Sequence, residues 1–168
     1  GTIGGELCRQ LAEFGPSHLC LIDSSEYALY SIDLEIKDNY PNLARASVIA
    51  DVRNKDRVLQ VFKKEAPTLV FHAAALKHVP IVEANPSEGI LTNIKGTRNI
   101  VDCCCATGVN AMVFISTDKA VNPTNIMGAS KRIAETYCQA FDLQEVIKTG
   151  FITVRVGNVL GSTWSVGP

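Results

Sequence analysis

The sequence predicts an α/β fold: a Rossmann-like, doubly wound parallel sheet. Short runs of β-branched and other apolar residues alternate with longer amphipathic stretches along the 168 residues. Strands joined by crossover helices produce this alternation. The strand candidates are apolar throughout, as expected of strands that helices cover on both faces. With 46% hydrophobic and 20% charged residues, the composition is that of an ordinary globular chain, so we expect one domain over residues 1–168.

The strands and helices are expected in regular succession. Strands are predicted over five apolar runs: residues 18–23, 46–51, 68–73, 111–116 and 151–156. Helices are predicted where apolar residues recur at helical spacing between glycine and proline signals: residues 4–14, 25–39, 55–65, 86–107 and 125–145. No strand precedes the first helix, and the sequence stops soon after the last strand. We therefore expect a fold truncated at both ends, without its first strand and most of a substrate lobe.

The charge pattern argues against two classes of partner. Sixteen basic and seventeen acidic residues leave a net charge of -1, with no block of like charge to attract nucleic acid or an anionic membrane. No apolar run approaches the roughly 18 residues needed to cross a bilayer, and no secretory signal opens the chain. We expect a cytoplasmic segment that makes no membrane contact.

The cysteines predict neither disulfides nor a metal site. Three of the six are consecutive, at Cys103, Cys104 and Cys105, and none belongs to a Cys-x-x-Cys pair with a suitable metal partner. Free buried thiols are expected, because free cysteine behaves as a small hydrophobic residue.

The start of the chain predicts a dinucleotide site. The first helix begins directly at Gly1, Thr2, Ile3 and Gly4. Helices begin in this way after glycine-rich phosphate loops, in which backbone N–H groups approach a pyrophosphate. A plain turn is the alternative. Asp23 ends the next strand 19 residues after Gly4, close to the roughly 20 expected of a ribose-binding acid; capping of the following helix is its alternative. A carboxylate without a following arginine favours NAD over NADP.

The other strand ends are expected to extend this cofactor site. Parallel strands bring their carboxyl ends to one edge of the sheet, where ligands bind. Small side chains there leave room for a cofactor, although tight packing also explains an alanine run. The cofactor-binding candidates at these ends are Ser24, Asp51, Val52, Ala73, Ala74 and Ala75.

A hydroxyl, a carboxylate and an ammonium follow one another at the end of strand 111–116. Thr117, Asp118 and Lys119 stand there after Ser116, and such a cluster can transfer protons. Met127 and Lys131 come later, one helical turn apart and on the same helix face. The catalytic candidates are the residues other than Ser116: Thr117, Asp118, Lys119, Met127 and Lys131.

On these residues the chain resembles the UDP-N-acetylglucosamine 4,6-dehydratases of polysaccharide and glycan biosynthesis, in the extended short-chain dehydrogenase/reductase superfamily. The resemblance covers nearly the whole chain. It is most specific over residues 116–125, followed by Met127 and Lys131. The wider superfamily implies a tyrosine acid/base at the position of Met127, and methionine cannot transfer a proton. Larger, membrane-anchored dehydratases are similar in carrying methionine there, so the first proton acceptor stays open.

The resemblance implies a mechanism and residue roles. Hydride leaves sugar carbon 4 for NAD, water is eliminated across carbons 5 and 6, and hydride returns to carbon 6. Lys119 would remove the carbon 5 proton, Asp118 would protonate the departing hydroxyl, and Thr117 would assist at the carbon 4 hydroxyl. Lys131 would hold the nicotinamide ribose. Burial and mutual repulsion of the lysines, Lys77 included, are expected to lower their pKa; a solvated surface charge is the alternative.

Four further residues resemble parts of the family's site. Lys77 and His78 correspond to the loop beside cofactor and substrate, Asn93 to an asparagine that orders the active-site loop, and Asn158 to the start of the sugar-nucleotide region, expected near residues 157–168. Simple turn or structural roles are the alternatives. The resemblance implies a UDP-sugar substrate and a homo-oligomeric full-length protein, and leaves open anchoring of the parent at the inner face of a bacterial membrane. A nucleotide-sugar epimerase, another 4,6-dehydratase and a non-catalytic dinucleotide-binding module are the competing functions.

Overall fold

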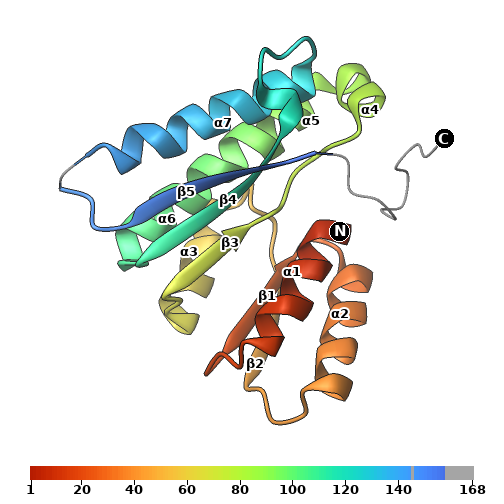
Figure 1. Cartoon of the computed structure of the whole chain (residues 1–168), viewed down its shortest axis with the longest axis vertical. Coiled ribbons are helices and arrows are strands. Elements are labelled where there is room, and N and C mark those ends of the chain that lie inside the picture. The colour runs from red at the N-terminus through yellow and green to blue at the C-terminus, as the bar shows by residue number, and fades with distance from the viewer. Residues whose placement is uncertain (145, 158–168) are drawn as a thin grey trace. The chain divides into compact units, whose positions relative to one another are not determined.

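The computed structural model describes residues 1–144 and 146–157. The chain forms two compact units, Gly1–Asp51 and Val52–Pro168. Both consist of parallel strands with helices packed on them (Figure 1). The α/β class expected from the alternating pattern is confirmed, and the single domain over residues 1–168 stays a prediction.

The first unit is a two-stranded parallel sheet with two helices. Its elements are α1 (Thr2–Glu13), β1 (Leu19–Asp23), α2 (Glu26–Asn39) and β2 (Arg45–Ile49). Leu19 pairs with Arg45 at one end of the sheet and Asp23 with Ile49 at the other. The helix α2 packs on both strands and against α1, and its Leu29 and Ile36 are buried. A hydrogen bond from Ala28 N to Ser25 Oγ at 3.3 Å starts α2.

The second unit holds a three-stranded parallel sheet in the order β3-β4-β5. Before the central strand come α3 (Lys55–Glu65), β3 (Leu69–His72), α4 (Val79–Ala84), α5 (Pro86–Gly89), the π-helix η1 (Ile90–Gly96) and α6 (Thr97–Thr107). The central strand is β4 (Ala111–Thr117). After it come the 3-10 turn η2 (Asp118–Ala120), α7 (Ile126–Asp142) and β5 (Gly150–Val156).

Helices α3, α6 and α7 build the core of this unit on one face of the sheet. Met112 and Phe114 of β4 point into it and are almost completely buried. The same core contains Val58, Phe62, Ile100, Val101, Cys103, Cys104, Val109, Ala134, Cys138 and Phe151. Residues of alternate register, among them Phe71 and Ile152, are exposed on the opposite face. The helices of this unit therefore cover one face of its sheet.

The segment 86–107 differs from the single helix that its spacing predicts. The structure divides it into α5, the π-helix η1 and α6, and it adds α4 and η2, which the pattern did not indicate. A π turn bonds residues five apart instead of four, and a change confined to so few residues does not show in the apolar spacing of the segment. A π turn in a helix often marks a functional segment. The strand after α2 also ends earlier than predicted, at Ile49.

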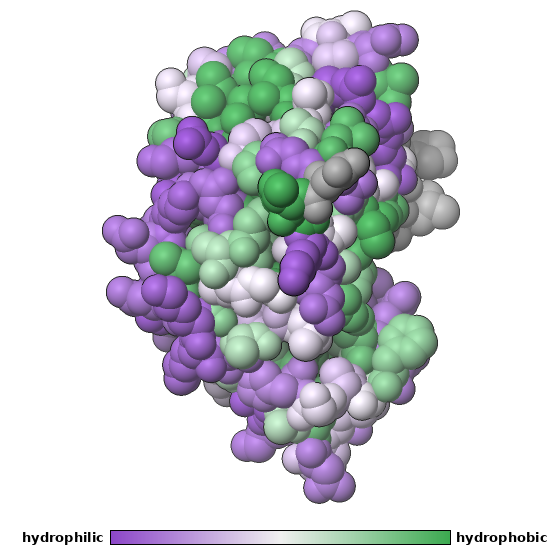
Figure 2. Space-filling model, turned by 90° about the vertical axis from the view of Figure 1, so that its left-hand side faces the viewer, coloured by the Kyte–Doolittle hydropathy of each residue, from purple (hydrophilic) through white to green (hydrophobic). Residues whose placement is uncertain are grey.

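All six cysteines are free. Cys103, Cys104 and Cys138 are buried, and burial raises the pKa of Cys103 to about 11. In residues 1–144 and 146–157, no three His, Cys, Asp or Glu side chains are grouped as a metal site would require. No helix in this described part of the chain has the length and apolar character of a membrane span. The face shown in Figure 2 is largely hydrophilic, with separate hydrophobic patches between.

Candidate active site

In the first unit, the start of α1 lies beside the end of β1. The Gly1 nitrogen is 3.7 Å from Asp23 Oδ2. No side chain caps α1 at Gly1, so the first N–H groups of the helix keep the capacity to bind an anion. A Cβ added to Gly4 would meet no atom within 4 Å. The structure therefore brings the start of α1 and the Asp23 carboxylate together, and dinucleotide binding there stays a prediction.

Asp23 does not cap the following helix. Ser25 fills that position, while Asp23 Oδ1 accepts a hydrogen bond from Ser25 N at 2.8 Å. This bond orients the carboxylate and leaves Oδ2 toward the start of α1. Ser24 beside it is exposed. The structure thus excludes Asp23 as the cap of α2, and its role as a ribose-binding acid stays a prediction.

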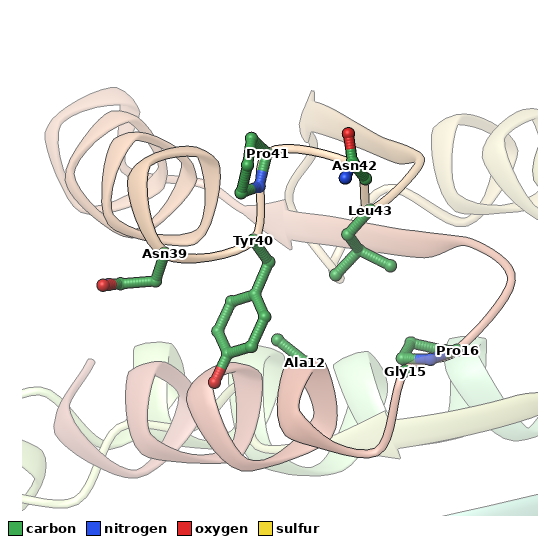
Figure 3. Close-up of a pocket in the computed structure, with 8 residues that line it drawn as sticks. All are labelled: Ala12, Gly15, Pro16, Asn39, Tyr40, Pro41, Asn42 and Leu43. Atoms are coloured by element: carbon green, nitrogen blue, oxygen red, sulfur yellow. The ribbon is translucent and has the colours of Figure 1, made fainter.

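The first unit also has a shallow hollow of about 440 Å³ at the other end of α1 (Figure 3). Its lining comes from the ends of α1 and α2 and the turns after them: Ala12, Gly15, Pro16, Asn39, Tyr40, Pro41, Asn42 and Leu43. These residues include no carboxylate, amine or imidazole. The phenol of Tyr40 is the one group among these eight residues that could take part in acid/base chemistry.

In the second unit, Thr117, Asp118 and Lys119 form one hydrogen-bonded cluster at the carboxyl end of β4. Thr117 Oγ1 donates to Asp118 Oδ1 at 2.9 Å, and Lys119 Nζ lies 3.2 Å from the same oxygen. Thr117 Oγ1 also accepts from Lys119 N at 3.3 Å, which starts η2. The hydrogen bonds from Thr117 and Lys119 lower the pKa of Asp118. The predicted juxtaposition of hydroxyl, carboxylate and ammonium is present.

The first turn of α7 supports this cluster from behind. Gly128 packs against the backbone carbonyl of Lys119 so closely that a Cβ there would collide with it. Asn125 Oδ1 caps the helix by accepting from Gly128 N at 2.8 Å, and Glu83 Oε1 accepts from Ile126 N at 2.5 Å. Met127 is buried in the same turn. The contact fixes η2 relative to the helix that carries Met127 and Lys131.

Lys131 is a buried cation, only 5% exposed. Its Nζ donates to Ile115 O at 2.6 Å and lies 4.1 Å from the centroid of the Phe114 ring. Burial lowers the pKa of Lys131 to about 8, and interactions with Cys138 and Glu135 partly oppose this shift. We expected both burial and neighbouring lysines to lower the pKa, and for Lys131 burial is the cause. Such an amine changes charge near neutral pH.

A buried asparagine anchors the loop after β3. Asn93 of η1 accepts from Leu76 N at 2.8 Å and donates to Leu76 O at 3.0 Å and to Ser130 Oγ at 2.9 Å. The loop includes Ala73, Ala74, Ala75, Lys77 and His78, of which Ala74 and Lys77 are exposed. Asn93 thus ties this loop to α7, as expected of a residue that orders it.

Comparison with known proteins decides the family. Residues 1–168 match the family described as "Polysaccharide biosynthesis protein". The chain belongs to this polysaccharide biosynthesis family. The resemblance and the Rossmann-like fold inferred from the sequence are both confirmed.

Individual members and a solved structure agree with this assignment. The capsular polysaccharide biosynthesis protein CapD of Staphylococcus aureus is 48% identical over 169 residues, which are 100% of this chain and 28% of CapD. A protein named UDP-N-acetylglucosamine 4,6-dehydratase (inverting), from Campylobacter jejuni, is 45% identical over 121 residues, 71% of this chain and 36% of that protein. The X-ray structure of Pen from Bacillus thuringiensis has a TM-score of 0.88 at 37% identity, covering 99% of this chain and 52% of Pen. The chain thus spans about half or less of each protein.

Several residues that shape the family site did not stand out in the sequence. Asn99 donates to the carbonyl oxygens of Val52 at 2.8 Å and Arg53 at 3.1 Å, which holds the loop after Asp51. The buried Glu135 carboxylate pairs with the exposed Arg155 at 2.7 Å. Glu135 lies four positions after Lys131 on a helix face that is mostly apolar. This spacing was the sequence signal that could have predicted a buried carboxylate. Asn158 lies outside the described residues.

Proposed function

We propose that the whole protein is an NAD-dependent nucleotide-sugar 4,6-dehydratase that acts on UDP-N-acetylglucosamine in surface polysaccharide or glycan synthesis. The single observation that carries the proposal is the cluster of Thr117, Asp118 and Lys119 at the end of β4, fixed against α7. The dehydratase named for the Campylobacter jejuni relative supports the substrate and reaction. A hydroxyl, an acid and an amine at one strand end suit an elimination that needs both a base and an acid.

The residues at the start of α1 fit an NAD cofactor. Gly1, Thr2, Ile3 and Gly4 would place N–H groups against the pyrophosphate, because the first N–H groups of a helix have no partner within the helix. Asp23 would accept hydrogen bonds from the adenosine ribose hydroxyls and repel a 2′-phosphate. Lys131 would hold the nicotinamide ribose. When bound, NAD supplies the hydride acceptor for carbon 4 and the hydride donor for carbon 6.

The proposed elimination requires the opposite protonation states from the observed ion pair. Lys119 must be neutral to take the carbon 5 proton, and Asp118 must be protonated to give one to the carbon 6 hydroxyl. One proton would have to pass from the ammonium to the carboxylate across the 3.2 Å contact, against the lowered pKa of Asp118. A substrate that displaces water favours this transfer, since burial disfavours the charged forms. Elimination then moves the carbon 5 proton to Lys119 and the Asp118 proton to the leaving hydroxyl, which departs as water.

Met127 would shape the site without taking part in proton transfer. Its side chain is buried at the start of α7 and has no transferable proton. Thr117, whose Oγ1 contacts Asp118, would assist at the carbon 4 hydroxyl. Lys77, His78 and Asn158 are proposed to contact the UDP-sugar.

The decisive experiment is incubation of the whole protein with UDP-N-acetylglucosamine and NAD. We expect a 4-keto-6-deoxy sugar nucleotide that has lost one water, without net NADH. Mass spectrometry and the ultraviolet absorbance of the keto sugar report this product. A sugar epimerised at carbon 4 with unchanged mass would instead establish an epimerase, and dinucleotide binding without turnover of sugar nucleotides would establish a binding module.

A further inference from the structure

His72 of β3 begins a line of buried hydrogen bonds that leads to the proposed active site. Its Nε2 lies 2.9 Å from Thr97 Oγ1, at the start of α6. Thr97 Oγ1 in turn donates to Asn93 O of η1 at 2.7 Å. His72, Thr97 and Asn93 are at most 3% exposed, and the proposed elimination uses none of their groups. These contacts tie the end of β3 to η1 and α6.

The geometry determines which nitrogen of His72 carries the hydrogen. A carbonyl oxygen only accepts hydrogen bonds, so the Thr97 hydroxyl must give its single hydrogen to Asn93 O. Thr97 Oγ1 can then only accept from His72, and the Nε2 atom of His72 must be the donor. Burial and the charge of Lys131 lower the pKa of His72 to about 3, which leaves the ring with one hydrogen at neutral pH. His72 is therefore a neutral imidazole with its hydrogen on Nε2.

The Thr97 hydroxyl contributes a hydrogen bond where the π-helix η1 ends. In an α-helix, the N–H of residue 97 would bond to the carbonyl oxygen of residue 93. Here Thr97 N donates to Ile94 O, and the side chain of Thr97 supplies the hydrogen for Asn93 O. The donor from His72 keeps the hydroxyl in this orientation, because it occupies the acceptor side of Thr97 Oγ1.

Asn93 carries the line of hydrogen bonds into two parts of the proposed site. Its side chain bonds Leu76 N and O in the loop after β3 and donates to Ser130 Oγ of α7. Ser130 Oγ then donates to Met127 O at 2.7 Å. Each donor in this line has one acceptor, so the direction of every bond follows from that of its neighbour. The hydrogen on His72 Nε2 thus belongs to the same network as the loop and the first turn of α7.

We propose that His72 is a positioning residue: its Nε2–H directs the Thr97 hydroxyl onto Asn93 O and so holds Asn93 where it anchors the loop over residues 73–78. The inference rests on the proposed function, in which this loop contacts the UDP-sugar. Without the donor, Thr97 can turn its hydroxyl away from Asn93 O. The loop should then open more often, and the sugar nucleotide should bind more weakly.

Two pairs of variants of the whole protein separate hydrogen bonding from packing. Thr97→Val keeps the branched shape and removes the hydroxyl, whereas Thr97→Ser keeps the hydroxyl and removes a methyl group. His72→Met and His72→Gln have similar lengths, and only glutamine can donate to Thr97 Oγ1. Hydrogen exchange over residues 73–78 is expected to become roughly 10-fold faster in Thr97→Val and His72→Met, because buried polar groups lose their partners. Thr97→Ser and His72→Gln should restore most of the protection. Impairment by Thr97→Ser equal to that by Thr97→Val, or unaltered exchange in His72→Met, would overturn the proposal.

The position of the hydrogen on His72 is measured directly by NMR of the unsubstituted protein labelled with ¹⁵N at histidine. The signals of His72 are identified by their loss in His72→Gln, and the protonated nitrogen is expected to be Nε2. A hydrogen on Nδ1 would overturn the proposal even if none of the variants folds.

Thr107→Val is the matched control. Thr107 Oγ1 donates to Cys103 O at 2.8 Å, also four residues earlier, but at the opposite end of α6. Its loss should leave exchange over residues 73–78 unchanged. In assays with UDP-N-acetylglucosamine, the Michaelis constant should rise in Thr97→Val and return toward the unsubstituted value in Thr97→Ser. No turnover by the unsubstituted protein contradicts the proposed function, whereas turnover with an unaltered loop in His72→Met contradicts only the role of His72.

Discussion

Gly128 and Lys119 lie in direct backbone contact, Cα against carbonyl, where the helix α7 meets the turn η2. This contact joins the element with Asp118 and Lys119 to the helix with Lys131. Its closeness depends on the absence of a side chain at position 128. The geometry of the proposed active site therefore depends on Gly128. A glycine is required there because a side chain would collide with Lys119, and not because of its backbone conformation.

Gly128→Ala is expected to push η2 away from α7. Overpacking of this kind typically costs about 1–3 kcal/mol of unfolding free energy, and turnover should fall more than the stability loss explains, because Asp118 and Lys119 move. Gly150→Ala is the control, since its Cβ would lie at an ordinary 3.8 Å from Asn110 O. Thermal unfolding and dehydratase assays of both variants check this. Full activity in Gly128→Ala would show that the contact does not position the cluster.

Lys119→Ala should abolish formation of the keto sugar while NAD still binds. The substitution removes the proposed base for carbon 5, and general acid–base groups typically contribute about 10²–10⁴-fold in rate. Lys95→Ala, at an exposed lysine of η1, provides the matched control. Product formation and NAD affinity are measured for both. Turnover retained by Lys119→Ala would remove Lys119 from the mechanism.

Asp23→Asn should weaken NAD binding without impairing folding. Hydrogen bonds to a charged group contribute about 1.5–3 kcal/mol, which corresponds to roughly a 10- to 100-fold loss of affinity. The amide oxygen can still accept from Ser25 N, so the turn after β1 should persist. Calorimetric titration with NAD and NADP measures the effect, and Asp38→Asn controls for lost surface charge. Equal NAD affinity in Asp23→Asn and the unsubstituted protein would contradict the ribose assignment.

Asn93→Ala is expected to release the loop after β3. Three hydrogen bonds of Asn93 hold Leu76 and Ser130, and unsatisfied buried partners cost about 1–3 kcal/mol each. Hydrogen exchange should become faster over residues 73–78, and the Michaelis constant for the sugar nucleotide should rise. Asn39→Ala, at an exposed helix end, should leave both unchanged. Unaltered exchange in the loop would show that other contacts order it.

Acid should destabilise the protein through Glu135. The pKa of this carboxyl falls from an ordinary 4.5 to about 2 on folding, so the unfolded chain takes up its proton first as pH decreases. The stabilisation, about 3 kcal/mol, is present above pH 4.5 and is lost as pH falls toward 2. Urea unfolding across acidic pH measures this slope. The slope of the unfolding free energy against pH should become smaller in Glu135→Gln. An identical slope in both proteins would show that other groups cause the loss of stability in acid.

Sequence pattern predicted the elements well where one periodicity dominated. The strand ending at Asp23 and the helix over 55–65 were placed to within a residue, because β-branched runs and amphipathic spacing are local signals. The helix over 86–107 covers the predicted residues, but it contains a π turn, Ile90–Gly96, that the spacing did not indicate. Its π turn accommodates Asn93, whose partners Leu76 and Ser130 are 17 and 37 residues distant along the chain.

The sequence by itself determined the parallel α/β class and the family. It also determined which strand end carries a hydroxyl, an acid and an amine. Each of these is a property of neighbouring residues or of a contiguous motif. Tertiary structure alone decided the environment of the charges. In the folded chain Lys131 is buried against Phe114, Glu135 binds two arginines, and Gly128 packs against Lys119. Desolvation and close contact depend on atoms brought together from distant parts of the chain, and no local pattern encodes them.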